Sequence, residues 1–224
     1  MGSAILVIGE PGTGKSRGIK HLDPKKTVVI KPNNKQLPFK GAASLYNTEN
    51  KNAFIATTFN ECATYIDAIN DKAPHVTTIV VEDLTHYFSA QVLKDAKDKG
   101  YDKWMNLAVM VFQAIIAKEA KLRKDLNLVV IAHTASTKDL SDNVVIGLQT
   151  PGKLLDNMVK IESYFTYILH TVVTEGDKGE TSYKLLTNRD GVRLAKTPEE
   201  MFPKYIDNDY QMVFASIKKY QEGE

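Results

Sequence analysis

The sequence predicts an α/β fold in which a mostly parallel sheet is flanked by helices and is followed by a C-terminal antiparallel hairpin. Short apolar runs alternate with segments of helical periodicity, which is typical of a parallel sheet with helices on its faces. Two later strand-like runs, 164–173 and 181–187, are separated by a glycine-containing turn, which predicts the hairpin. The 224 residues, of which 43% are hydrophobic and 25% charged, suit a single domain over 1–224.

The strands of the parallel sheet are expected where apolar residues run without interruption. They cover 4–8, 27–30, 53–57, 77–81 and 126–132. The segment 31–52 contains two prolines and few apolar residues, so we expect an irregular surface segment there, with room for a small hairpin.

Helices are expected between and after these strands. They cover 15–21, 58–70, 85–97, 101–125, 153–158 and 210–220. The second begins with a capping box formed by Thr58 and Glu61. The longest carries two neighbouring apolar stripes, one through Trp104 and one through Met105 and Phe112. A face this wide is expected to be buried against more than one neighbour, as core or, alternatively, as a subunit contact.

The segment after the first strand matches the pattern G-x-x-x-x-G-K-[ST], which cradles phosphates. The residues expected to bind a nucleoside triphosphate are Gly9, Glu10, Pro11, Gly12, Thr13, Gly14, Lys15, Ser16 and Arg17. The glycines let backbone N–H groups turn toward a polyanion, and the helix N-terminus adds partial positive charge. We expect Lys15 to reach the outer phosphates, and to face solvent when the site is empty. The Ser16 hydroxyl is expected to ligate phosphate-bound Mg²⁺.

Two acids, Glu82 and Asp83, follow the strand 77–81 and so lie at the edge of the sheet where ligands of α/β proteins bind. We expect one to orient Mg²⁺ and the other to polarise the attacking water, with either assignment open. Alternation along an extended chain would send their side chains to opposite sides, so only one is expected to face the nucleotide. The alternative role for one of them is to cap the next helix.

Two further side chains are candidates for catalysis. His133 ends the strand 126–132 at the same edge of the sheet, beside the expected γ-phosphate, where a sensing role competes with a structural one. Arg189 follows the second hairpin strand, where a surface charge is the simple interpretation. ATPases that form rings or filaments take a cation from the neighbouring subunit, and Arg189 is our candidate for it.

Composition limits the classes of partner. A net charge of +2 gives no general argument for a nucleic-acid partner, so contact with DNA would need a local patch. Cys62 is the single cysteine, which excludes an intramolecular disulfide. No apolar run is long enough to span a bilayer and no cleavable signal precedes the first strand, so we expect a soluble, cytoplasmic protein that has no membrane partner.

Several segments, taken in order, resemble the RecA-like ATPases of bacteriophages, specifically the Sak-type group linked to single-strand annealing and recombination. The matching segments are 9–16, 35–41, 80–83, 100–103, 130–134, 152–156 and 195–202. The resemblance implies a RecA-like P-loop NTPase core, ATP and Mg²⁺ as cofactors, and the host cytoplasm as location. It also implies single-stranded DNA as a partner, a homo-oligomer, and a single-strand binding or annealing protein as a further partner.

Residue by residue, the resemblance implies that Lys15 and Ser16 bind the phosphate and the metal. Glu82 stands where the family more often has Asp. Arg189 falls where RecA relatives place cations that reach the adjacent subunit's nucleotide.

The segment 135–152 is polar and lacks periodicity, and a loop of this length in a compact domain is usually functional or mobile. By the resemblance, 136–150 within it falls where RecA-like proteins carry a mobile DNA-contacting loop. This one is not basic, because Lys138 is offset by Asp139 and Asp142.

Two alternatives to a DNA-coupled ATPase stay open. One is a nucleotide-gated loader or adaptor that touches DNA only through a partner, which the near-neutral charge favours. The other is a small-molecule kinase, which the lack of an arginine-rich lid segment disfavours. By the resemblance, RecA's catalytic glutamate has no counterpart, since Lys31 and Pro32 stand there. Hydrolysis is then expected to be slow or to rely on Glu82 or Asp83.

Overall fold

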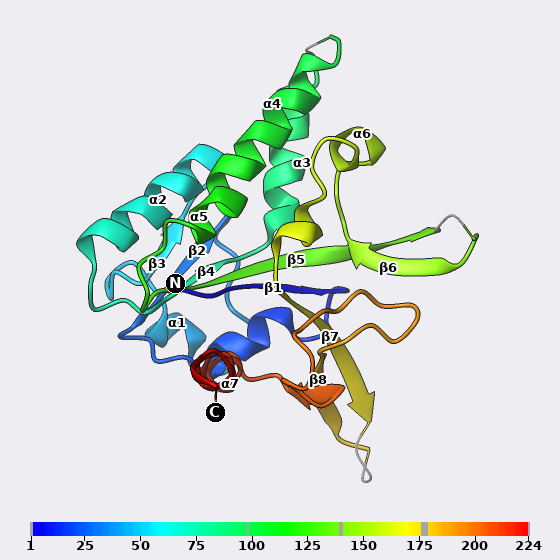
Figure 1. The fold of residues 1–224 in the computed structure, drawn as a ribbon. Coiled ribbons are helices and arrows are strands. Elements are labelled where there is room, and N and C mark those ends of the chain that lie inside the picture. Colours follow the sequence, from blue (N-terminus) through cyan, green and yellow to red (C-terminus); the bar gives the residue numbers. More distant parts are fainter. Residues whose placement is uncertain (1, 98, 139–140, 176–178, 224) are drawn as a thin grey trace.

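The computed structural model describes residues 2–97, 99–138, 141–175 and 179–223 (Figure 1). Within them nine strands form a sheet in the order β3-β2-β4-β5-β1-β7-β8-β9, with β6 paired to β5 beside this path. The strands are β1 Ala4–Gly9, β2 Thr27–Lys31, β3 Ala53–Ile55, β4 Thr78–Val81, β5 Asn127–Lys138, β6 Val144–Leu148, β7 Tyr167–Glu175, β8 Thr181–Leu186 and β9 Tyr205–Asp207. From β3 to β7 along this order the strands are parallel, which confirms the predicted α/β fold.

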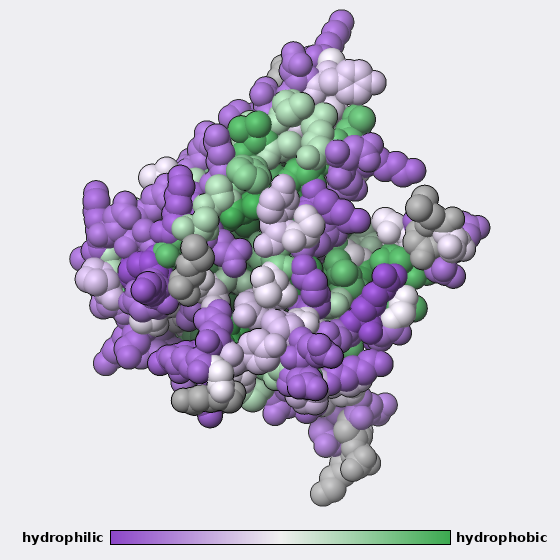
Figure 2. Space-filling view, in the orientation of Figure 1, coloured by the Kyte–Doolittle hydropathy of each residue, from purple (hydrophilic) through white to green (hydrophobic). Residues whose placement is uncertain are grey.

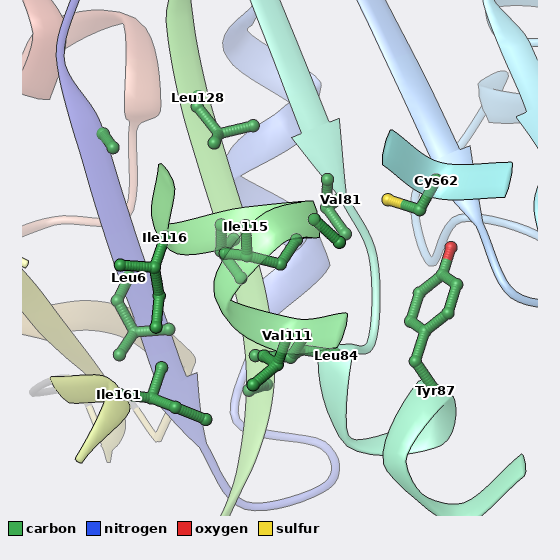
Figure 3. Packing of buried hydrophobic residues seen from close by; sticks show 14 of the residues in the cluster. Leu6, Cys62, Val81, Leu84, Tyr87, Val111, Ile115, Ile116, Leu128 and Ile161 are labelled. Atoms are coloured by element: carbon green, nitrogen blue, oxygen red, sulfur yellow. The ribbon is translucent and has the colours of Figure 1, made fainter. Parts of the chain in front are cut away.

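Helices cover both faces of the sheet (Figure 1). They are η1 Lys15–His21, α1 Ala42–Leu45, α2 Phe59–Lys72, α3 Leu84–Lys94, α4 Asp102–Val111, η2 Phe112–Ile116, α5 Ala117–Glu119, α6 Lys153–Asp156, η3 Ile161–Tyr164 and α7 Tyr210–Glu222. The central strand β1 is buried throughout, and its side chains alternate between two cores. Leu6 and Ile8 join the core under α2 to α4, whereas Ile5 and Val7 join the core under η1 and α7. Figure 3 shows the first core, where side chains of β1, β4 and β5 meet those of α3, α4 and η2.

The helix expected over 101–125 is divided by the π-helical turn η2, which separates α4 from α5. Its inner stripe is buried, but Met105, Val109 and Phe112 are 53%, 45% and 40% exposed. Apolar side chains gather over α4 in Figure 2. The expectation that both stripes are buried is therefore wrong within this chain: the ring of Tyr164 contacts Phe112 edge to face, but the outer stripe stays exposed to solvent.

The expectation of an irregular loop over 135–152 is also wrong. The strand β5 continues to Lys138, and β6 returns antiparallel, paired from Thr134↔Leu148 to Lys138↔Val144. Together they form an arm that projects from the body in Figure 1. Strands of an exposed two-stranded arm need no continuous apolar run, and β-branched threonine and valine suit them, so the sequence lacked the usual strand signal.

The C-terminal hairpin is confirmed: β7 and β8 pair antiparallel from His170↔Leu186 to Glu175↔Thr181. Its turn residues 176–178 lie outside the described residues. The short strand β9, which the sequence did not predict, adds to β8. The segment 31–52 is irregular as expected, with the short helix α1 and no hairpin. Among the helices described here, none is long and apolar enough to cross a membrane.

Candidate nucleotide-binding site

The phosphate-loop motif makes the turn between β1 and η1, at the carboxyl end of the central strand. Of the residues 9–17 expected to bind nucleotide, Gly9 ends β1 and the others lie in this turn or in the first turn of η1. Gly14 adopts φ 93°, and a Cβ there would lie 2.5 Å from the ring of Tyr183, so only glycine fits. The following helix is of the tighter 3₁₀ type over Lys15–His21.

A cavity of about 360 Å³ opens beside this loop. Its walls are the phosphate loop, the pair Glu82 and Asp83 with His133, and the segment 31–38 that follows β2. Tyr183 of β8 completes the rim. The size and the convergence of charged groups fit a small-molecule site. The sequence-predicted residues of the loop, the strand end and β5 are thus brought together in one place.

Lys15 is the most enclosed charge of the cavity, with a relative exposure of 8%. Its Nζ donates to the carbonyl oxygens of Gly9 and Glu10, each at 2.9 Å, and lies 3.2 Å from Nδ1 of His133. Burial lowers the pKa of Lys15 to about 8, although Asp83 and Glu82 act in the opposite direction. The expectation that Lys15 faces solvent in the empty site is wrong, since the loop carbonyls draw the ammonium inward.

His133 joins Lys15 to Asp83. A lysine ammonium only donates, so Nδ1 of His133 accepts from it and the ring proton is assigned to Nε2. That atom lies 3.6 Å from Oδ2 of Asp83. The backbone N–H of His133 donates to the hydroxyl of Thr85 at 2.9 Å, which ties β5 to the start of α3. The imidazole is therefore fixed between a cation and a carboxylate.

Glu82 carries the strongest indication of a bound cation. Its Oε1 is buried and has no hydrogen-bond partner in the described chain. Burial raises the pKa of Glu82, whereas the Ser16 hydroxyl and the positive charges of Lys35 and Lys15 lower it. A buried carboxylate oxygen without a partner is unfavourable, and a divalent cation beside Ser16 would satisfy it.

The described residues fit Mg²⁺ bound together with phosphate rather than alone. Among them no group of three or more His, Cys, Asp or Glu side chains is placed to hold a metal. Mg²⁺ usually keeps several waters and binds through one or two protein oxygens plus substrate phosphates. Ser16 and Glu82 supply such oxygens at the edge of the phosphate loop.

Asp83 has a left-handed backbone conformation, with φ 56°. Its Oδ1 accepts the N–H of His86 at 3.3 Å, so it caps α3, as one of the two sequence interpretations held. Burial alone would raise the pKa of Asp83, but its contacts with His133 and with the His86 amide hold it below its ordinary value. Because the strand ends at Val81 and Asp83 turns left-handed, both acids face the cavity. The expectation from strand alternation that only one would do so is wrong.

Arg189 lies in the loop after β8 and is exposed. It does not belong to the described lining of the cavity. The loop passes beside the arm, where Ile146 pairs with Arg193, and Arg193 in turn forms an ion pair with Asp190 at 3.0 Å. On the arm itself, Lys138 pairs with Asp142 at 3.0 Å, and Asp139 lies outside the described residues.

Sequence reasoning missed several residues at this site. Lys35 lines the cavity from the irregular segment after β2. Tyr183 stacks its ring against the Arg17 guanidinium, whose carbon lies 4.8 Å from the ring centre. Asn208 and Tyr210 contact the loop from the C-terminal segment. None follows a local pattern, since each comes to the phosphate loop or to its cavity only through the tertiary fold.

A comparison with protein families shows to which family the chain belongs. A family model described as AAA domain matches residues 1–198. The chain belongs to the AAA domain family. Membership indicates a P-loop ATPase that binds and hydrolyses nucleotide, with Mg²⁺ as the usual cofactor. A search of the curated proteins gives no match.

Proposed function

We propose that this AAA domain is a RecA-like, Mg²⁺-dependent ATPase of the phage Sak type that acts with single-stranded DNA in recombination, annealing or replication. The observation that supports it best is a single cavity holding three features. These are the phosphate loop, the unpartnered Oε1 of Glu82, and the contact series from Lys15 through His133 to Asp83.

Each side chain then has a role. Lys15 leaves the loop carbonyls to pair with phosphate oxygens, while Ser16 and Glu82 hold Mg²⁺, which neutralises phosphate charge when bound. Asp83 stays ionised because its pKa is low, and it orients the attacking water together with His133. Lys35 stands near Glu82 and offers a second cation to the phosphates.

DNA coupling is supported by the course of β5. The same strand carries His133 in the cavity and Lys138 in the arm. A displacement of the arm by single-stranded DNA would therefore be transmitted along one strand to the residue that touches Lys15. The paired charges Lys138 and Asp142 would have to separate for phosphate contact.

The homo-oligomer is supported by two exposed features. Arg189 is solvent-exposed and lies outside the described lining of its own cavity, as a cation acting on a neighbour would. The outer stripe of α4 and η2, with Met105, Val109 and Phe112, leaves apolar area for a subunit contact (Figure 2).

The deciding experiment measures phosphate release with and without single-stranded DNA, alongside the mass of the protein with a non-hydrolysable ATP analogue and Mg²⁺. DNA-stimulated release and nucleotide-dependent assembly are expected. Assembly without DNA binding and without DNA-stimulated phosphate release would instead support the loader or adaptor. The ion pair between Lys138 and Asp142 favours this alternative, because it leaves the lysine charge of the arm neutralised. Absence of ATP binding would contradict both.

A further inference from the structure

The C-terminal segment 205–222 lies directly against the helix that follows the phosphate loop (Figure 1). Its strand β9 pairs with β8, and Lys184 and Asp207 form an ion pair at 2.6 Å. Val213 and Ile217 of α7 are buried in the same core as Ile19 of η1. The segment is thus fixed on two sides before it reaches the loop.

Two side chains of this segment donate hydrogen bonds to loop carbonyls. Nδ2 of Asn208 donates to the carbonyl oxygen of Gly14 at 2.7 Å. The hydroxyl of Tyr210 donates to the carbonyl oxygen of Lys15. Both donors are enclosed, with relative exposures of 4% and 0%. A carbonyl only accepts, so the amide nitrogen of Asn208 must be the atom that faces Gly14.

The consequence follows from peptide geometry. In a planar trans peptide unit the C=O and the N–H point in opposite directions. The Gly14 carbonyl also accepts the N–H of Arg17 at 2.9 Å, so Asn208 adds a second donor that holds this carbonyl and keeps the Lys15 N–H directed away from the C-terminal segment. A donor on the Lys15 carbonyl does the same for the Ser16 N–H. Lys15 and Ser16 both line the cavity.

The chain makes room for this arrangement at Gly18. A Cβ there would lie 2.5 Å from Cε1 of Tyr210, so the phenol ring reaches the Lys15 carbonyl only because residue 18 has no side chain. Burial and the nearby charge of Glu82 raise the pKa of Tyr210 well above its ordinary value. Its hydroxyl therefore keeps the proton that it donates.

We propose that Asn208 and Tyr210 are positioning residues that hold the Lys15 and Ser16 amides toward the phosphates of a bound nucleotide. The proposal rests on the function proposed for the cavity. Both residues lie beyond 1–198, the part that matches the AAA domain model, so the positioning is a property of this chain's C-terminal segment.

The test compares Tyr210→Phe with Tyr46→Phe. Tyr46 is buried in the same core, and its hydroxyl donates to the carbonyl oxygen of Leu22, at the other end of η1, at 3.4 Å. Both variants lose one hydroxyl and keep the ring. We expect Tyr210→Phe to bind a fluorescent ATP analogue with Mg²⁺ roughly 3- to 10-fold more weakly, as one lost neutral hydrogen bond implies. Tyr46→Phe is expected to bind as wild type.

A second measurement needs no nucleotide. Amide hydrogen exchange of peptides covering 14–16 is expected to quicken in Tyr210→Phe, and in Asn208→Ala, but not in Tyr46→Phe. Unchanged affinity and unchanged amide exchange in Tyr210→Phe would overturn the positioning role. An equal loss of affinity in Tyr46→Phe would overturn it too, because it would indicate general loosening of the core. If the wild type binds no nucleotide, the proposed function fails, and the exchange comparison still decides whether these side chains position the amides.

Discussion

Nζ of Lys15 lies 3.2 Å from Nδ1 of His133, although the two residues are 118 positions apart in the sequence. The residue expected to bind the outer phosphates and the residue expected to sense them are therefore in contact in the folded chain. Movement of Lys15 toward a phosphate would free Nδ1 of His133. The imidazole could then accept a hydrogen bond from water while Asp83 holds its other nitrogen.

Lys15→Ala is expected to abolish ATP binding and to leave the fold intact. Because the two hydrogen bonds that Lys15 donates to carbonyls oppose the cost of burying its charge, its loss is expected to change the free energy of unfolding by no more than about 1–2 kcal/mol at neutral pH. Titration calorimetry and thermal unfolding measure the two effects. Lys20→Ala, an exposed site on the same helix, is the control, and near-wild-type ATP affinity in Lys15→Ala would remove the phosphate-loop assignment.

Glu82→Gln and Asp83→Asn are expected to separate the roles of the two acids. Glu82→Gln should lose the Mg²⁺ dependence of ATP affinity, because its carboxylate lies beside Ser16. Asp83→Asn should bind ATP normally but turn over at least about 100-fold more slowly, as loss of a positioned general base implies. Wild-type hydrolysis in both variants would show that neither acid is catalytic.

The pKa of Lys15 predicts a pH dependence. It is about 8 in the folded chain and 10.5 in the unfolded reference, so between these values the unfolded state binds more protons. The free energy of unfolding of the nucleotide-free wild type should therefore rise with pH from about 8 to 10.5, relative to that of Lys15→Met. Chemical denaturation at several pH values measures this difference. If the free energies of unfolding of wild type and Lys15→Met differ by the same amount across the range, the pKa of Lys15 is not lowered.

In the arm formed by β5 and β6, the amides of Lys138 and Val144 are expected to exchange quickly, because a two-stranded ribbon has little tertiary support. Single-stranded DNA should slow this exchange. The β7–β8 hairpin serves as the internal reference, since it does not belong to the proposed DNA contact. DNA binding without any change in the arm would place the contact elsewhere.

Arg189→Ala is expected to bind ATP yet hydrolyse it poorly, because a planar cation at the neighbour's γ-phosphate would be missing. Mixed with Lys15→Ala, which keeps Arg189 but has an inactive cavity, it should recover part of the activity at shared interfaces. Phosphate release of the mixture is the readout. No recovery in a preparation shown to co-assemble would leave Arg189 as a surface charge.

The parallel strands could be predicted because strands buried on both faces leave continuous apolar runs, as β1 and β4 do. The start of α2 could also be predicted, because the Thr58 hydroxyl accepts the N–H of Glu61 at 3.2 Å, as expected of a capping box. The arm and the π-helical turn could not be predicted. Strands of an exposed ribbon need no apolar run, and a π turn is a rare single-turn feature inside an α-helix that has no residue pattern of its own.

The candidate site could be predicted where it depends on the ends of neighbouring parallel strands, which meet at one edge of the sheet. Glu82 and His133 reach the cavity in this way. The orientation of Asp83 could not be predicted, since it depends on a single left-handed residue after the strand. Lys35 comes from an irregular segment, and Asn208 from a distant one.

The hydrogen bond from Asn208 to Gly14 joins residues 194 positions apart, and this separation affects how the protein is made. During synthesis the phosphate loop leaves the ribosome before Asn208, whose side chain donates to it from 194 positions further along the chain. Contacts of such long range also close late in folding, since a large loop must be ordered first. A nascent chain therefore carries the complete phosphate-loop motif before the side chains that hydrogen-bond to the carbonyls of Gly14 and Lys15 have been synthesised.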